Sequence, residues 1–143
     1  MPRVHVPDDF AHDPSAYVWS HYAPEIAGGA ASYIHAVYTK SRLPLRELEA
    51  ARMRTAYING CELCLGMRSD RDLAGFLESA GIDPRQAVSA RGDAVPDEQF
   101  YGEIENWQTS DCYSSRERLI IEYADRFGRI SHAISIFDDQ ALA

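Results

Sequence analysis

The sequence has no long apolar run. Nothing in its 143 residues approaches the roughly 20 consecutive apolar residues that a transmembrane helix needs. The first 13 residues also lack the apolar centre of a secretory signal peptide, and they carry Asp8, Asp9 and Asp13. We therefore expect a cytoplasmic protein that neither crosses a membrane nor follows the secretory route.

Positive charge and cysteine are both scarce. Lysine and arginine together number 14 against 22 aspartates and glutamates, which gives a net charge of -8. Phosphate backbones and anionic lipids repel such a chain, so nucleic acid and membrane surfaces are poor partners. Three cysteines, an odd number in a chain without an export signal, argue against a framework of structural disulfides. Any disulfide here should be transient and chemical.

Long alternating stretches of Val, Ile or Thr are missing as well, and apolar residues instead recur at intervals of three and four. The sequence therefore predicts an all-α fold. The length suits one domain with a core of its own. We expect an N-terminal arm over residues 1–13 and a single all-helical domain, a helical bundle, over 14–143.

The expected helices are placed by caps and stop signals. Asp13-Pro14 starts the first helix, Asn59-Gly60 stops the third, and Ser114 with Glu117 forms a capping box. The helices are expected to begin at 14, span 24–41, 45–58 and 61–80, restart briefly at 84, span 97–107, and begin again at 114 and 134, with a loop over 89–96. In the helix from 114, the predicted buried stripe consists of Leu119, Ile120, Tyr123, Ala124 and Phe127.

Two cysteines, Cys61 and Cys64, stand three residues apart at the start of a predicted helix. This spacing places both thiols on one face, and the helix amino terminus favours the thiolate that acts as nucleophile in exchange and in peroxide reduction. A structural zinc site is an alternative, but it needs four ligands, and only Cys112 remains as a third thiol. The plainest alternative is that both are small buried apolar residues.

The surrounding run strengthens the redox interpretation. Residues 45–52, LRELEAAR, are followed by residues 56–64, AYINGCELC. This pattern resembles the AhpD-like/carboxymuconolactone decarboxylase superfamily, and the likeness extends over roughly residues 24 to 130. The resemblance implies an all-α fold, homo-oligomers, and a cysteine pair that cycles between dithiol and disulfide. It also implies that Glu49 takes the place of a proton-relay glutamate.

Two positions depart from the pattern of the peroxidase members. Leu63 stands between the cysteines where those members carry one histidine, and Arg68 stands where they carry another, four residues after the second cysteine. Arginine does not release a proton near neutral pH, so Arg68 cannot serve as the base. It can act by charge, and we expect it to stabilise the Cys64 thiolate, to bind a carboxylate substrate or to pair with Glu49.

Three functions follow as hypotheses. The first is a thiol-dependent, peroxidase-like oxidoreductase in which Cys64, by resemblance, or Cys61, nearer the helix start, attacks a peroxide. An external thiol reductant would reset the pair, and no metal or organic cofactor is required. The second is a decarboxylase-like enzyme that acts on a small carboxylate without the thiols. The third is a catalytically silent oligomeric module. For all three functions we expect a homo-oligomer whose interface includes the aromatic helix around Tyr33.

Overall fold

The computed structural model describes the backbone of residues 4–141 and the side chains of residues 4–130. Every regular element within this part of the chain is a helix, so the all-α prediction is confirmed. Contacts within the chain distinguish two compact units, Met1–Ser41 and Arg42–Ala143. The predicted boundary between an arm and a domain at residue 13 stays a prediction. None of the described helices is both long and apolar enough to span a bilayer.

The first unit is built on aromatic contacts. Asp13 caps α1 by accepting a hydrogen bond from the Ala16 N–H, which confirms the predicted start at Pro14. The Phe10 and Tyr17 rings lie 4.8 Å apart, and His21 stacks on Tyr17 at 4.2 Å. The unit consists of the 3₁₀ helix η1 (Asp8–Phe10), α1 (Pro14–His21) and α2 (Pro24–Lys40).

The second unit contains the cysteine pair. Its elements are α3 (Leu45–Asn59), α4 (Glu62–Gly66), α5 (Ser69–Ser79), the 3₁₀ helices η2 (Pro84–Gln86) and η3 (Val88–Arg91), α6 (Glu98–Gly102) and α7 (Ser115–Ala141). The predicted capping box is confirmed, because the Ser114 N–H donates to Glu117 Oε2 at 2.7 Å and the Glu117 N–H donates to Ser114 Oγ at 3.2 Å.

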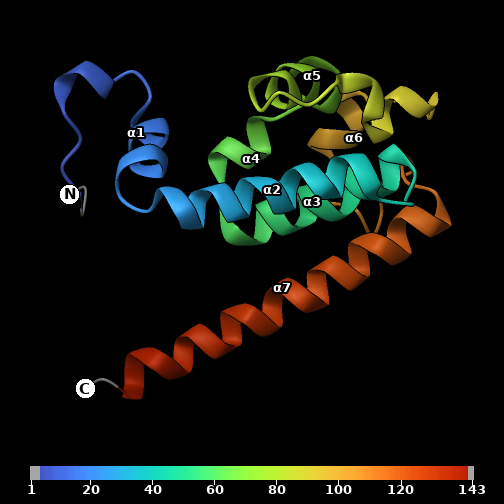
Figure 1. Ribbon diagram of the computed structural model, residues 1–143. Coiled ribbons are helices and arrows are strands. Elements are labelled where there is room, and N and C mark those ends of the chain that lie inside the picture. Colours follow the sequence, from blue (N-terminus) through green and yellow to red (C-terminus); the bar gives the residue numbers. More distant parts are fainter. Residues whose placement is uncertain (1–3, 142–143) are drawn as a thin grey trace. The chain divides into compact units, whose positions relative to one another are not determined.

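Three predicted helix boundaries are wrong. The helix expected over 61–80 is two helices, α4 and α5, separated by extended residues at 67 and 68. In place of the helix expected over 97–107, α6 ends at Gly102 and the chain continues in turns. No new helix begins at 134, because α7 runs without a break from Ser115 to Ala141 (Figure 1). The first part of the expected loop over 89–96 belongs to η3.

Helices α3 and α7 pack together and run in the same direction. Arg46 donates to Glu117 at 2.6 Å near the start of both helices, and Arg54 donates to Asp125 at 2.5 Å about two turns further along both. Arg54 is only 4% exposed, so its ion pair joins the helices inside the fold. Around these helices the core gathers residues from α3, α6, the following turns and α7, namely Ala50, Met53, Phe100, Tyr101, Ile104, Trp107, Tyr113 and Ile121.

The buried face of α7 differs from the predicted stripe. Ile121 is fully buried and Ala124 is 6% exposed, whereas Leu119, Tyr123 and Phe127 are 65%, 72% and 63% exposed. The ion pairs to α3 determine which face of α7 is buried. Glu117 and Asp125 face α3, so the apolar residues between them on the same face, Ile121 and Ala124, are buried as well. Of the five predicted stripe residues, only Ala124 is among the buried core residues.

Candidate redox site

Cys61 and Cys64 form a disulfide at the start of α4, with their Cα atoms 5.3 Å apart. Cys61 is the N-cap residue of this helix, and its Sγ accepts a hydrogen bond of 3.3 Å from the Cys64 N–H. Both residues are partly exposed. The two sulfurs are therefore joined to each other and held at a position that solvent reaches.

The turn before the pair follows from Gly60. This residue adopts the left-handed conformation, with φ of 61°, and it ends α3 where the sequence predicts. The Cys61 N–H donates back to the Ala56 carbonyl at 3.0 Å, so the first cysteine closes the helix end. The chain then reverses, and α4 packs against α3.

Helix α4 is much shorter than predicted. It contains 5 residues, from Glu62 to Gly66, so fewer aligned peptide dipoles act on the cysteines than in the expected helix over 61–80. The direct hydrogen bond from the Cys64 N–H to Cys61 Sγ remains. Stabilisation of a thiolate at Cys61 thus depends on this one donor more than on the helix as a whole.

The break after α4 leaves backbone carbonyls without helical donors. In a continuous helix the N–H groups of Arg68 and Ser69 would bind the carbonyls four residues earlier. Here the Arg68 N–H donates to Asp72 Oδ2 at 2.8 Å, and the Ser69 N–H donates to the Tyr101 hydroxyl at 3.3 Å. The carbonyls of residues 64 and 65 therefore need other donors.

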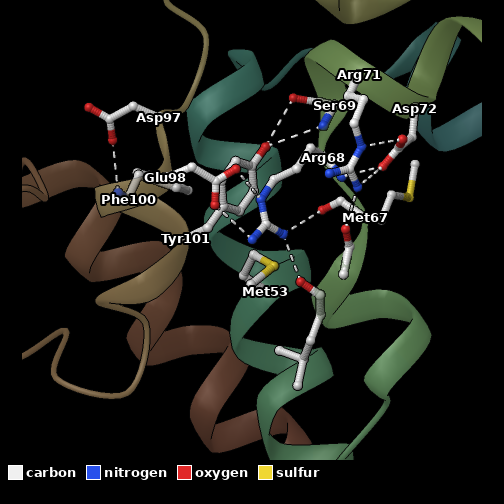
Figure 2. Close-up of polar contacts among 12 residues, drawn as sticks. Met53, Met67, Arg68, Ser69, Arg71, Asp72, Asp97, Glu98, Phe100 and Tyr101 are labelled. Atoms are coloured by element: carbon white, nitrogen blue, oxygen red, sulfur yellow. Dashed lines mark hydrogen bonds and ion pairs between the residues drawn. The ribbon is translucent and has the colours of Figure 1, made fainter.

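Arginine side chains supply these donors. Arg52 donates to the carbonyls of residues 64 and 67, Arg68 to those of 65 and 67, and Arg71 to that of 66. We call residues 64–67 the arginine-capped segment. Figure 2 shows the Arg68 and Arg71 side chains converging on it. Each arginine also binds a carboxylate; the pairs are Arg52 with Glu49, Arg68 with Glu98 and Arg71 with Asp72.

Glu49 lies at the base of this site and is fully buried. Its two carboxylate oxygens accept hydrogen bonds from the Arg52 guanidinium at 2.9 and 2.8 Å. The Tyr101 hydroxyl donates to Oε2 at 3.0 Å. A buried carboxylate needs such partners, and here α3 supplies the charged one and α6 the neutral one.

Arg68 does not form the predicted ion pair with Glu49. Its Nε and NH2 groups bind the two oxygens of Glu98 at 2.8 and 2.9 Å, and its guanidinium lies 4.3 Å above the Tyr101 ring (Figure 2). The physical reason is the break at residue 67, which turns Arg68 toward α6 while Arg52 takes the carboxylate of Glu49. The expected action of Arg68 on the Cys64 thiolate stays a prediction.

Titrating groups around the arginine-capped segment are shifted by their partners. Hydrogen bonds from the Arg71 guanidinium and from the Arg68 N–H lower the pKa of Asp72 to about 2. The Arg68 guanidinium lowers the pKa of Glu98. Burial raises the pKa of Tyr101, against the opposing hydrogen bond from Ser69. The carboxylates that balance two of the arginines are therefore stabilised as anions.

The third thiol stands apart from the pair. Cys112 is a free, partly buried cysteine whose Sγ accepts a hydrogen bond of 3.1 Å from Ser110 Oγ. Within the described part of the chain, no group of three or more His, Cys, Asp or Glu side chains is arranged to hold a metal ion. The sequence from 42 to 130 contains no histidine, so the second unit offers no described imidazole as a base.

Two site residues escaped the sequence analysis. Arg52 enters the sequence analysis only as the last residue of the run 45–52, whereas in the structure it pairs with the buried carboxylate of Glu49. Tyr101 lies in a segment expected to be an acidic helix, and nothing local connects it to Glu49, 52 positions away. The break between α4 and α5 could have been predicted in part from the sequence, because Gly66 is a poor helix former and Ser69-Asp70 is typical of a helix start.

Comparison with protein-family models, with curated proteins and with solved structures finds no match to this chain.

Proposed function

We propose that this protein is a thiol-dependent oxidoreductase of the AhpD-like kind, which reduces peroxides through a dithiol–disulfide cycle of Cys61 and Cys64. The observation that supports the proposal most is the disulfide at the start of α4, in which Cys61 Sγ also accepts the Cys64 N–H. A reversible pair needs sulfurs within bonding distance and access to solvent, and this pair has both.

The cycle balances without a metal or organic cofactor. One thiolate attacks the terminal peroxide oxygen, the O–O bond breaks, and the departing alkoxide takes up a proton to leave as an alcohol. The sulfenic acid that forms is attacked by the second cysteine, which releases water and closes the disulfide. An external thiol reductant then exchanges with this disulfide and restores both thiols.

Two arguments assign the attacking thiol differently. The resemblance assigns it to Cys64, whereas the hydrogen bond from the Cys64 N–H stabilises negative charge on Cys61. Single variants separate the assignments. The variant that keeps the attacking cysteine accumulates a sulfenic acid that dimedone traps, and the variant that loses it does not.

The proposal includes a cytoplasmic location, as the composition predicts, and assembly into homo-oligomers, as the resemblance implies. It also includes slow turnover, because Leu63 and Arg68 replace the histidines of the peroxidase pattern. A positioned acid or base typically contributes about 10²-fold or more to the rate, and Arg68 is engaged with Glu98. That engagement also weakens the alternative in which Arg68 binds a carboxylate substrate.

Peroxide titration tests the proposal directly. Reduced protein is treated with one equivalent of cumene hydroperoxide or hydrogen peroxide, and free thiols and disulfide-linked peptides are measured by mass spectrometry before and after dithiothreitol. We expect loss of the Cys61 and Cys64 thiols, a bridge between them, and recovery on reduction. Cys112→Ser is the matched control and should behave as the parent protein.

Different results favour the other functions. If the thiols survive peroxide, or if the double variant Cys61→Ser/Cys64→Ser consumes peroxide as fast as the parent protein, the peroxidase proposal is wrong. A decarboxylase-like enzyme would keep its activity in the double variant of Cys61 and Cys64. A silent module would show neither activity, although its fold would be intact by circular dichroism.

A further inference from the structure

Arg52 connects the buried carboxylate of α3 to the backbone of the redox motif. The Nε and NH2 groups on one edge of its guanidinium bind both oxygens of Glu49, at 2.9 and 2.8 Å. NH1 donates to the Cys64 carbonyl at 2.5 Å, and NH2 also donates to the Met67 carbonyl at 3.0 Å. Its side chain is 17% exposed and that of Glu49 is fully buried, so these bonds form largely out of water.

The peptide groups of Cys64 are held on both sides. Its N–H donates to Cys61 Sγ at 3.3 Å, and its C=O accepts from Arg52. Fixing the two peptide groups fixes the direction of the Cα–Cβ bond, so that only rotation about χ1 remains to place the second sulfur relative to the first. The bond to Arg52 involves no sulfur, so it can persist after the disulfide opens.

We infer that Arg52 is a positioning residue for the cysteine pair: by holding the Cys64 carbonyl, it keeps the reduced sulfur of Cys64 within closing distance of Cys61 and so favours the disulfide. This inference rests on the proposed thiol–disulfide chemistry. It adds a residue that touches neither sulfur nor substrate, and it gives Glu49 a second task, which is to orient Arg52.

Charge alone does not account for the arrangement. A cation near the pair needs no defined geometry, whereas Arg52 makes two bonds to one carboxylate and two to carbonyls at either end of the arginine-capped segment. A planar guanidinium suits this task because its donors are fixed relative to one another. Lysine would keep the charge and lose most of the geometry.

Arg71 provides a matched control. It also binds a carboxylate, Asp72, and caps a carbonyl of the same segment, that of Gly66, but it makes no bond to Cys64. If capping the segment in general were enough, removal of Arg71 would have the same effect as removal of Arg52. If the Cys64 carbonyl is what counts, the two variants will differ.

The test measures the thiol–disulfide equilibrium of the full chain in glutathione buffers of defined ratio. Thiols are trapped with iodoacetamide, and the fraction of the Cys61–Cys64 bridge is quantified by mass spectrometry. We expect Arg52→Gln to lower the equilibrium constant for disulfide formation by about tenfold, because closing the disulfide must then order the backbone of Cys64 that Arg52 otherwise holds in the reduced protein. Arg52→Lys should fall between Arg52→Gln and the parent protein, and Arg71→Gln should match the parent protein.

Folding is monitored in parallel, so that loss of structure is not mistaken for loss of positioning. Circular dichroism and urea unfolding are recorded for each variant, and Arg52→Lys serves if Arg52→Gln does not fold. Equal equilibrium constants for the folded Arg52 variant and Arg71→Gln would overturn the inference. A parent protein that exchanges with glutathione but consumes no peroxide would refute the proposed function while leaving the role of Arg52 intact.

Discussion

Arg68 shows how one side chain is committed to several contacts at once. It binds Glu98, lies over the Tyr101 ring and caps the carbonyls of Leu65 and Met67. Each contact is modest on its own, since Glu98 is largely exposed. Together they fix the side chain on α6 and leave it little freedom to approach Glu49.

Arg68→His should therefore not restore a proton relay. The shorter imidazole gives up the capping bonds, and both oxygens of Glu49 already accept from Arg52. We expect peroxide consumption to stay near that of the parent protein, and the free energy of unfolding to fall by roughly 1 to 2 kcal/mol. Coupled peroxide assays and urea unfolding measure the two effects, with Arg68→Lys as control. A rise in turnover would show that residue 68 can reach the relay.

Glu49 offers a test of two roles at the same residue. If it orients Arg52, Glu49→Gln shifts the glutathione equilibrium in the direction of Arg52→Gln, because a neutral amide holds the guanidinium less tightly. If it acts only as a proton relay, the equilibrium constant is unchanged and peroxide turnover alone falls. We expect the first result, with stability lowered as well, since Glu49 is fully buried.

At the scale of elements, the start of α5 carries a pH-dependent contribution to stability. The pKa of Asp72 is lowered from 3.8 to about 2 by Arg71 and by the Arg68 N–H. A carboxyl whose pKa is lower in the folded than in the unfolded state stabilises the fold at pH values above its unfolded-state pKa. This contribution is lost as the pH falls through the folded-state pKa. Asp72→Asn removes the charge and keeps a hydrogen-bond acceptor.

We expect Asp72→Asn to be less stable than the parent protein at neutral pH. The difference should hold down to about pH 5, shrink below about pH 4, and vanish only below about pH 2. Urea unfolding at these pH values measures it. A constant difference at every pH would mean that the carboxylate charge does not contribute.

Helices α3 and α7 lie close together at Gly128. A Cβ atom at this position would lie 3.0 Å from Ile58 Cδ1 and 3.4 Å from its Cγ2, whereas one at Gly75 in α5 would meet nothing within 4 Å. We expect Gly128→Val to lower the free energy of unfolding by about 1 to 3 kcal/mol through overpacking. Gly75→Val is the control and should be nearly neutral.

A compensating change identifies the contact. If Ile58 is the obstacle, Ile58→Ala should cost less stability in the Gly128→Val background than alone, because the valine methyl groups fill the space that isoleucine leaves. Additive effects of the two substitutions, measured by urea unfolding, would place the strain elsewhere along α7.

At the scale of the whole molecule, the exposed apolar stripe of α7 supports the proposed homo-oligomer. Leu119, Tyr123, Phe127 and Ile130 follow one face of the helix and are each more than 60% exposed. Apolar stripes of this kind are typical of surfaces that another chain covers. Tyr33, expected at the interface, is 71% exposed in its own unit.

Light scattering at micromolar concentration tests the assembly. We expect a mass above the 16.0 kDa of one chain, and a lower mass for Leu119→Glu combined with Tyr123→Glu. Val95→Glu changes an exposed apolar residue outside α7 and should leave the mass unchanged. A parent protein that runs as a monomer would contradict the homo-oligomer prediction.

What the sequence determined by itself depends on neighbours a few residues apart. The spacing of apolar residues determined the all-α class. Asn59-Gly60 determined where α3 ends, and Ser114 with Glu117 determined where α7 begins. The three-residue spacing of Cys61 and Cys64 brought the two cysteines close together. Each of these depends on hydrogen bonds or side-chain positions within about one helical turn. Local rules suffice there because the partners are fixed by the chain itself.

Only the tertiary structure decided how the site is supported. The burial of Glu49 depends on Tyr101, the path of the chain after Gly66 on Arg52, and the buried face of α7 on Asp125. Most of these residues are many positions away in the sequence from the groups that they bind. An arginine on an amphipathic helix looks like a surface residue until the carbonyls or carboxylates that it binds are brought to it. Their approach is a property of the packed chain, since burial strengthens each hydrogen bond and penalises each polar group left without one.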